Sequence, residues 1–302
     1  MPLTTTCHAC DPSNPDRIFA PAAGGWLASF AAHLNGPPAV VNGGVVAGSL
    51  ACPALALAHD QGVHHPAVIR VTARIRRPVP VAIGLHAVAA PGGDGVIDVT
   101  IRRGEEALVV GAVQVADAGR GSTPGQMLQP VPHHLAGELD AMARTSLGEP
   151  GPLAVPDEDH PFPDCFSCGP ANSRGLRIFP HTTATPAVRS SWQPAAALVE
   201  ANGALPTAIV GAALDCSNAM ALSVAHEQMD GMRALEPILA AYDMRILRMP
   251  PADQPGGYRV VARATGEDGR RYFSMSAMFD ADGAPYAVAE TTWVLLPKGS
   301  FA

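Results

Sequence analysis

Hydrophobic positions along the chain follow a pattern that occurs twice. Each half has one long apolar stretch of helical length, Gly43–His59 in the first half and Thr207–His226 in the second. Four runs rich in β-branched and apolar residues follow each stretch, separated by turn sequences such as Asp280-Ala-Asp-Gly. We expect antiparallel strands at Ala67–Arg76, Val81–Ala89, Val96–Arg102, Ala107–Ala116, Ala240–Leu247, Tyr258–Thr265, Tyr272–Phe279 and Tyr286–Leu296.

Both expected helices are apolar almost all round, and such a helix must be covered on several sides. A curved antiparallel sheet wrapped round one central helix in each half meets that need. Pro53 lies inside the first helix and predicts a kink or break there, because proline lacks the N–H that the helix requires. The pattern therefore predicts an α+β fold.

The cysteines repeat with the same period as the hydrophobic pattern. Cys7-His-Ala-Cys10 and Cys165-Phe-Ser-Cys168 each precede an Arg-Ile-Phe sequence, and Cys52 and Cys216 occupy equivalent positions in the two helices. Three equivalent positions in the same order indicate an internal duplication.

The duplication divides the chain into two units and a connection. We expect an N-terminal unit at 1–128, a linker at 129–159 and a C-terminal unit at 160–302. The linker carries proline and glycine, and Leu135–Ala143 within it has the composition of a short helix.

Composition and charge exclude several classes of protein. Hydrophobic residues make up 47% of the 302 residues and the net charge is -7, so a sizeable core is expected and a broad nucleic-acid-binding face is not. The start of the chain has no signal-peptide pattern. No membrane span is expected, because Asp215, Ser217 and Asn218 interrupt the most apolar stretch, Thr207–Val224. We therefore expect a cytoplasmic protein whose cysteines are reduced thiols or metal ligands rather than a disulfide framework.

Three features resemble the hotdog-fold thioesterase superfamily in its double-hotdog form. Asn42-Gly43-Gly44 resembles the His-Gly-Gly or Asn-Gly-Gly turn that opens the family's central helix. In the second half, Asp215 matches an acidic residue that the family has nine positions past the first residue of the turn. The aligned turn in this half starts at Pro206. The third feature resembles the segment before the first strand of many bacterial members, and consists of Cys165-Phe-Ser-Cys168-Gly169-Pro170, Asn172 and Gly175-Leu176.

The resemblance implies a double hotdog, with two antiparallel sheets each wrapped round a central helix. It also implies hydrolysis of a small-molecule acyl thioester, usually an acyl-CoA. In the family each site lies between two units, of which one supplies a glycine N–H and the other the carboxylate.

Aligning the two halves shows that they differ in complementary places. Asn42-Gly43-Gly44 aligns with Pro206-Thr207-Ala208, and Ala51 aligns with Asp215. Asp215 is roughly 12 Å from its own helix start, at 1.5 Å per residue, which is too far for a hydrogen bond. If the helices lie antiparallel about 8–10 Å apart, Asp215 comes near the start of the other helix. We therefore expect one composite site, and an inactive second site that pairs Thr207 with Ala51.

The chemistry of the composite site follows from its residue types. N–H groups of Gly43 and Gly44 at a helix start can hold the oxyanion that forms when a thioester is attacked. Asp215 can act as general base or nucleophile, and its burial raises the carboxyl pKa. A structural turn and a structural carboxylate remain the alternatives. Three further residues are candidates for orienting water or substrate. Asn42 is a candidate catalytic residue, and Ser217 and Asn218 are candidate substrate-binding residues.

Basic residues and cysteine pairs are further candidate ligands. Arg77 and Arg248 lie just before prolines at strand ends, where they could contact CoA phosphates or form solvated strand faces. The two Cys-x-x-Cys pairs could together hold zinc, or pack as buried thiols. No other cofactor is expected. The four thiols of that hypothetical zinc site are Cys7, Cys10, Cys165 and Cys168.

Two other functions compete with hydrolysis. A hotdog protein that binds acyl-CoA without turnover fits the loss of half of each motif and the prolines at positions 53 and 206. A hotdog hydratase fits less well, because such enzymes pair the aspartate with a histidine, and the second copy has none at the aligned turn. Exposed sheet edges could also pair two chains into a homo-oligomer.

Overall fold

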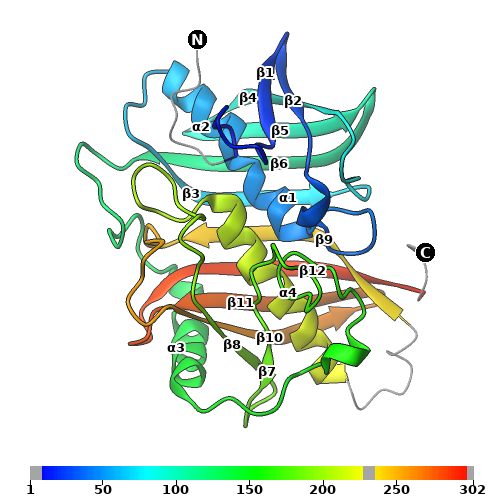
Figure 1. Cartoon of the computed structure of the whole chain (residues 1–302). Helices are drawn as coiled ribbons and strands as arrows, with labels where there is room; N and C mark the ends of the chain where they lie inside the picture. Colours follow the sequence, from blue (N-terminus) through cyan, green and yellow to red (C-terminus); the bar gives the residue numbers. More distant parts are fainter. Residues whose placement is uncertain (1–8, 227–234, 298–302) are drawn as a thin grey trace.

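The structure is a computed structural model that describes residues 9–226 and 235–297. Within these ranges twelve strands form one antiparallel sheet in the order β1-β2-β4-β5-β6-β3-β9-β12-β11-β10-β8-β7 (Figure 1). The strands of the N-terminal half are β1 (Phe19–Ala22), β2 (Gly25–Ala28), β3 (Pro66–Ile75), β4 (Leu85–Gly93), β5 (Val96–Arg103) and β6 (Glu106–Asp117). Those of the C-terminal half are β7 (His181–Thr182), β8 (Val188–Trp192), β9 (Leu235–Ile246), β10 (Tyr258–Asp268), β11 (Arg271–Phe279) and β12 (Pro285–Pro297).

The two halves join edge to edge through β3 and β9. These strands pair antiparallel from Arg70 opposite Arg245 to Arg74 opposite Ala241. The α+β class is confirmed, and the two expected sheets continue into one another as a single sheet. This junction brings the two central helices close together on one face.

The central helices are α1 (Gly43–Ser49) with α2 (Ala51–Asp60) in the first half, and α4 (Thr207–His226) in the second. They lie side by side over the sheet (Figure 1). A Cβ added at Gly44 would fall 2.7 Å from the Asp215 Cβ, and one added at Gly48 would fall 2.7 Å from the Ala208 Cα. Since the partner number falls as the α1 number rises, α1 and α4 run antiparallel. Glycine at both positions permits this close approach.

The first central helix breaks where proline predicts it. α1 ends at Ser49 and α2 begins at Ala51. Pro53 has no N–H to donate to the Ser49 carbonyl, so the hydrogen-bond ladder is interrupted one turn before the proline. The short α1 is therefore a separate unit that presents its N-terminus to α4.

The connection between the halves contains a full helix. α3 (His133–Leu147) is longer than the Leu135–Ala143 that composition predicts, because polar residues extend it at both ends. Its apolar side packs on the sheet face opposite α4 and forms a separate cluster with β10, β11 and β12. Part of the predicted linker, 129–159, thus packs against the sheet of the second half. The α3 side chains in this cluster are Leu135, Leu139 and Met142.

Each of the eight predicted strands overlaps a strand of the structure, but the two differ in where they begin or end. β4 begins at Leu85 rather than Val81, and β9 begins at Leu235 rather than Ala240. The sequence pattern does not indicate β1, β2, β7 and β8, because these strands have two to five residues and lie at the sheet edges. Such strands are too short to show a period of two.

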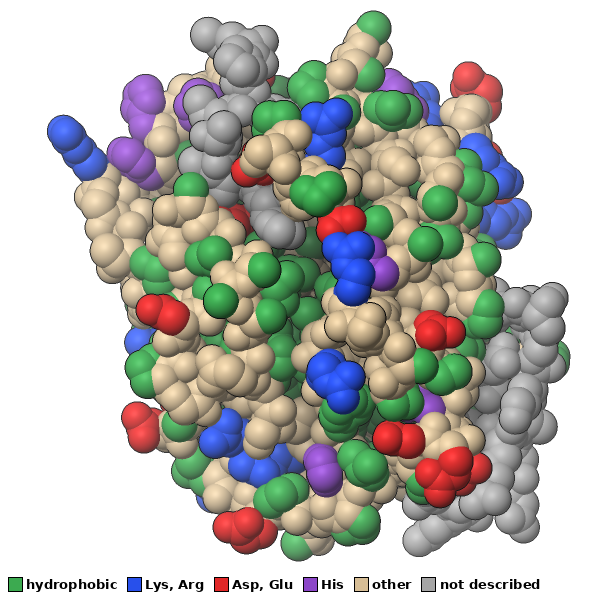
Figure 2. Space-filling model, in the orientation of Figure 1, with side chains coloured by type: hydrophobic (Ala, Val, Ile, Leu, Met, Phe, Trp, Pro, Cys, Tyr) green, Lys and Arg blue, Asp and Glu red, His purple; other side chains and the backbone are tan. Residues whose placement is uncertain are grey.

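Among the described residues, one helix is long and apolar enough to cross a membrane by length and composition. It is Thr207–Ala225 of α4, and 78% of this stretch is buried inside the fold as a core helix. Figure 2 shows acidic and basic side chains distributed over the described part of the helix-bearing face.

Candidate active site

Asp215 is a buried acid at the contact between the two halves. It lies in α4 and is 4% exposed. The start of α1 packs directly against it, since a Cβ added at Gly44 would fall 2.7 Å from the Asp215 Cβ. The N–H groups of Gly44 and Gly43 and the Asn42 side chain are close enough to stabilise its carboxylate. Its Oδ1 has no hydrogen-bond partner among the described residues. The structure thus brings together the acid of one half and the glycine turn of the other.

Burial dominates the electrostatics of this carboxyl group. It raises the pKa of Asp215 to about 7, while the hydrogen bond from the Gly44 N–H acts in the opposite direction. The nearby Cys165 sulfur raises this pKa further, and Asn42 and Gly43 lower it. A carboxyl group in this setting exchanges a proton near neutral pH, which suits a general base or acid.

Asn42 is held from two sides. Its Oδ1 accepts a hydrogen bond from the Val45 N–H at 3.0 Å, which caps α1. Its Nδ2 donates to Ser167 Oγ at 3.3 Å and lies 3.7 Å from Cys216 Sγ. Asn42 therefore fixes the start of α1 against both α4 and the Cys-x-x-Cys loop of the second half.

Tyr242 also belongs to this region, although the sequence did not single it out. Its hydroxyl donates to the Gly211 carbonyl of α4 at 2.9 Å, and its ring is 1% exposed. Both burial and the Asp215 charge raise the pKa of Tyr242, so it remains a neutral donor. A lone tyrosine in a strand carries no sequence signal of this role, because the contact depends on how β9 packs against α4.

The hydrogen bonds of the remaining sequence candidates are made with groups other than the acid. Asn218 donates to Ser276 Oγ of β11 at 2.7 Å, on the sheet side of α4, and Ser217 Oγ is buried without a hydrogen-bond partner among the described residues. Arg77 donates to the exposed Glu106 at 3.0 Å. Arg248 follows β9, where its backbone N–H bonds the Tyr286 carbonyl. These contacts do not join the cluster around Asp215.

The pseudo-equivalent second location carries no acid. A Cβ added at Gly48 would clash with the Thr207 carbonyl at the start of α4, and Ala51 is 3% exposed. In the aligned sequences Thr207 and Ala51 occupy the places of the glycine turn and the carboxylate. That these two residues form an inactive second site stays a prediction.

The cysteines differ from expectation. Cys10 and Cys52 form a disulfide across 6.7 Å between their Cα atoms, so the expectation that the thiols are reduced or metal-bound is wrong for this pair. Cys165 and Cys168 gather with Cys216 of the same half, not with Cys10. Cys10, Cys165 and Cys168 therefore do not form the hypothetical four-thiol zinc site together, and Cys7 lies outside the described residues. Cys10 instead bonds to Cys52, and Cys165 and Cys168 lie beside Cys216.

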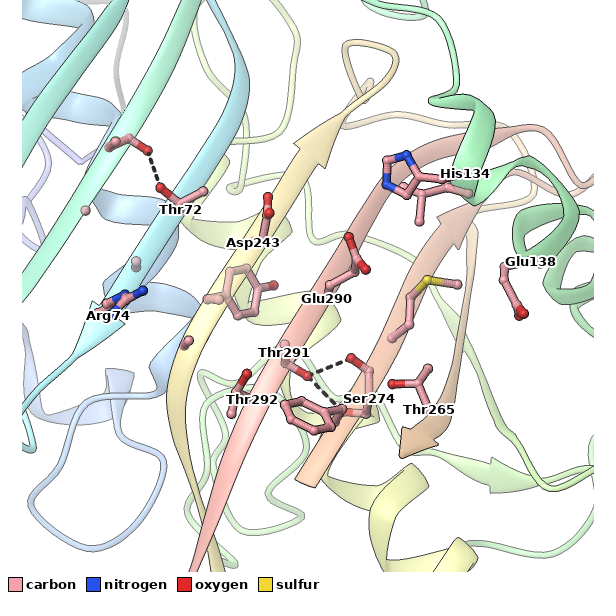
Figure 3. Close-up of a pocket in the computed structure, with 18 of the residues that line it drawn as sticks. Thr72, Arg74, His134, Glu138, Asp243, Thr265, Ser274, Glu290, Thr291 and Thr292 are labelled. Carbon is pink, nitrogen blue, oxygen red and sulfur yellow. Dashed lines mark hydrogen bonds between the residues drawn. The ribbon is translucent and has the colours of Figure 1, made fainter. Parts of the chain in front are cut away.

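Two cavities lie away from Asp215. A groove of about 1040 Å³ follows the sheet face that carries α3, with Asp243, Glu290 and Glu138 among its lining residues (Figure 3). A second cavity of about 680 Å³ lies beside α2 near His59 and Trp26. Neither is lined by Asp215 or the glycine turn, so the acid is covered in this conformation.

The chain resembles known proteins in its fold rather than in its sequence. No protein-family model matches the sequence, and no curated protein does. A hot dog fold protein from Alicyclobacillus acidocaldarius superimposes with a TM-score of 0.60 at 14% identity, covering 92% of this chain and 95% of that one.

The fold is a double hotdog.

Two further structures that superimpose on this chain have functional names. The acyl-CoA thioesterase II TesB2 from Mycobacterium marinum has a TM-score of 0.56 at 12% identity, covering 94% and 96% of the two chains. The dehydratase domain of RzxB from Pseudomonas fluorescens has a TM-score of 0.54 at 17% identity, covering 92% and 97%. Because a protein named as a thioesterase and one named as a dehydratase domain both superimpose on this chain at 12% and 17% identity, the likeness supports the fold and leaves the reaction to be argued from the site.

Proposed function

We propose that this double hotdog hydrolyses an acyl thioester of the acyl-CoA kind at one composite site between its halves. One observation carries the proposal: the buried carboxylate of Asp215 in α4 faces the N–H groups that start α1 in the other half. A buried acid without a cationic partner is costly, and such groups concentrate at functional sites.

The two glycines suggest a division of labour. The Gly44 N–H acts on the Asp215 carboxylate more strongly than the Gly43 N–H does. Gly44 would hold the acid in place, and Gly43 would donate to the thioester oxygen at the positive end of the α1 dipole. The Leu239 side chain lies over Gly43 and has to move aside for that approach, since a Cβ added at Gly43 would fall 2.6 Å from the Leu239 Cδ2.

The reaction then needs only water and the thioester. Asp215 accepts a proton as water adds to the carbonyl carbon, and the negative charge moves to the oxygen at Gly43. When the carbon–sulfur bond breaks, the thiolate takes up the proton and leaves as a thiol, with a carboxylic acid as the second product.

The test is release of free thiol from a panel of acyl-CoA esters of different chain length. Asp215→Asn is expected to lower the rate on the order of 10²–10⁴-fold, because amide cannot accept the proton. Asp98→Asn is the matched control, since it removes an exposed carboxylate on the sheet and leaves the contact between α1 and α4 intact. An Asp215→Asn rate equal to that of Asp98→Asn would contradict the proposal.

The competing function of acyl-CoA binding without turnover gives a different result in the same samples. In that case acyl-CoA raises the melting temperature of the wild-type protein, yet no thiol appears with any ester of the panel. Addition of water to an enoyl-CoA, measured as the loss of the enoyl-CoA absorbance, would instead indicate the hydratase.

A further inference from the structure

Three sulfur atoms gather at one buried point of the C-terminal half. Cys165 and Cys168 lie in the loop before the second half's first strand and are each 2% exposed; Cys216 lies in α4 and is 9% exposed. All three sulfurs lie within 4.8 Å of one another, and Cys165 Sγ is 3.3 Å from Cys216 Sγ. Two segments separated by about fifty residues of chain therefore meet through sulfur.

The separations suit a tetrahedral metal ion. Zinc–sulfur bonds of about 2.3 Å in tetrahedral geometry place the sulfurs roughly 3.8 Å apart. The Cys165–Cys216 separation of 3.3 Å and the upper bound of 4.8 Å for all three pairs lie on either side of that value. Two ligands from a Cys-x-x-Cys loop and one from a distant helix is also a common way to supply zinc ligands.

Hydrogen-bond donors surround the sulfurs on the protein side. The backbone N–H groups of Ser167 and Cys168 lie near the Cys165 sulfur, where they stabilise negative charge on it. Asn42 Nδ2 lies 3.9 Å from the Cys165 sulfur and 3.7 Å from that of Cys216. Donors of this kind compensate the charge of buried thiolates and orient metal ligands. Three apolar thiols packed in a core have no need of them.

No side chain of the described residues fills the fourth position. Among the described residues, no other His, Cys, Asp or Glu ligand atom lies within 4.8 Å of all three sulfurs. His160 is close enough to interact electrostatically with Cys165, but its Nδ1 accepts the Phe162 N–H at 3.1 Å. That contact leaves the proton of the neutral ring on Nε2, which makes His160 a donor rather than a ligand.

We propose that Cys165, Cys168 and Cys216 bind one Zn²⁺ ion as three thiolates, with a solvent molecule or small anion as the fourth ligand. Binding releases the thiol protons. The ion would tie the Cys-x-x-Cys loop to α4 immediately after Asp215, and so fix the acid against the start of α1. The site is independent of which reaction Asp215 performs.

The wild-type protein allows a test that needs no variant. Full-length protein purified in zinc-containing medium without chelator is expected to carry about one zinc per chain by elemental mass spectrometry. X-ray absorption at the zinc edge is expected to show three sulfur neighbours near 2.3 Å and one lighter neighbour near 2.0 Å. After exchange for Co²⁺, intense thiolate-to-cobalt charge-transfer bands should appear.

The internal duplication supplies a matched pair of variants. Cys168→Ser removes a proposed ligand, and the double variant Cys10→Ser/Cys52→Ser removes the two cysteines of the disulfide in the first half. Zinc content is expected to fall at least tenfold in the first and to stay at about one per chain in the second. If Cys168→Ser fails to fold by circular dichroism, the absorption spectrum of the wild type still decides.

Three results would overturn the proposal. One is wild-type protein that takes up neither Zn²⁺ nor Co²⁺. Another is a Cys165–Cys216 disulfide in the native protein, found by peptide mass mapping under non-reducing conditions. The third is a zinc edge spectrum with fewer than three sulfur neighbours. Thioester hydrolysis enters none of these readouts, so a failure of the metal site and a failure of the proposed activity are distinguishable.

Discussion

At the scale of single residues, Gly44 shows how strictly the site depends on the absence of a side chain. A Cβ at this position would clash with the Gly211 carbonyl and fall 2.7 Å from the Asp215 Cβ. Neither obstacle is the flexible end of a side chain, so the two helices would have to separate.

Gly44→Ala is therefore expected to destabilise the fold by about 1–3 kcal/mol and to displace the N–H groups from the acid. Gly137→Ala in α3 is the matched control. A Cβ there meets nothing within 4 Å, so the change should be neutral or add roughly 0.5–1 kcal/mol through helix propensity. Urea unfolding measures both free energies, and equal effects of the two substitutions would show that the α1–α4 contact is looser than described.

At the scale of elements, the pairing of β3 with β9 decides whether the two halves share one sheet. Arg70 of β3 makes two hydrogen bonds to Asp243 of β9, at 2.8 and 2.5 Å, beside the backbone ladder. This ion pair is partly shielded, with side-chain exposures of 35% and 27%. A two-point contact of this kind is stronger than an ordinary surface ion pair.

A double-mutant cycle on Arg70→Ala and Asp243→Ala is expected to give a coupling free energy of up to about 1 kcal/mol in denaturant unfolding. The same cycle on Arg77 and Glu106 serves as the comparison. That pair makes one hydrogen bond within the N-terminal half and is more exposed, so no measurable coupling is expected. An equally large coupling free energy for Arg77 and Glu106 would mean that the Arg70–Asp243 pair stabilises the junction no more than an exposed ion pair would.

At the scale of the whole molecule, the chain is a fused pseudo-dimer with one complete set of site residues. Only the location that combines Gly43 with Asp215 has both a glycine turn and an acid; Thr207 and Ala51 occupy the other. A non-hydrolysable acyl-CoA thioether is therefore expected to bind at about one equivalent per chain in titration calorimetry. Asp215→Asn should retain that stoichiometry, whereas binding of two equivalents to the wild type would show that the second location is also occupied.

The sequence by itself determined the α+β class and the main elements of this protein. Apolar stretches such as Thr207–His226 predicted covered helices, because a helix that is apolar all round must be buried on several sides, and eight apolar runs between turn sequences predicted the long strands. The alignment of the halves also placed Gly43 and Asp215 in different copies. Those features depend on residues that lie near one another in the chain or repeat at a fixed offset.

Only the tertiary structure decided which residues far apart in the sequence contact one another. The β3–β9 junction and the Gly44–Gly211 approach set the distance from the acid to the helix start, and no local pattern encodes such a distance. No local pattern encodes the hydrogen bond from Tyr242 to α4 either. Nor does one encode the grouping of Cys216 with Cys165 and Cys168 rather than with the cysteines of the first half. Contacts between segments far apart in sequence follow from how sheets and helices pack as bodies, and that packing is a property of the assembled chain.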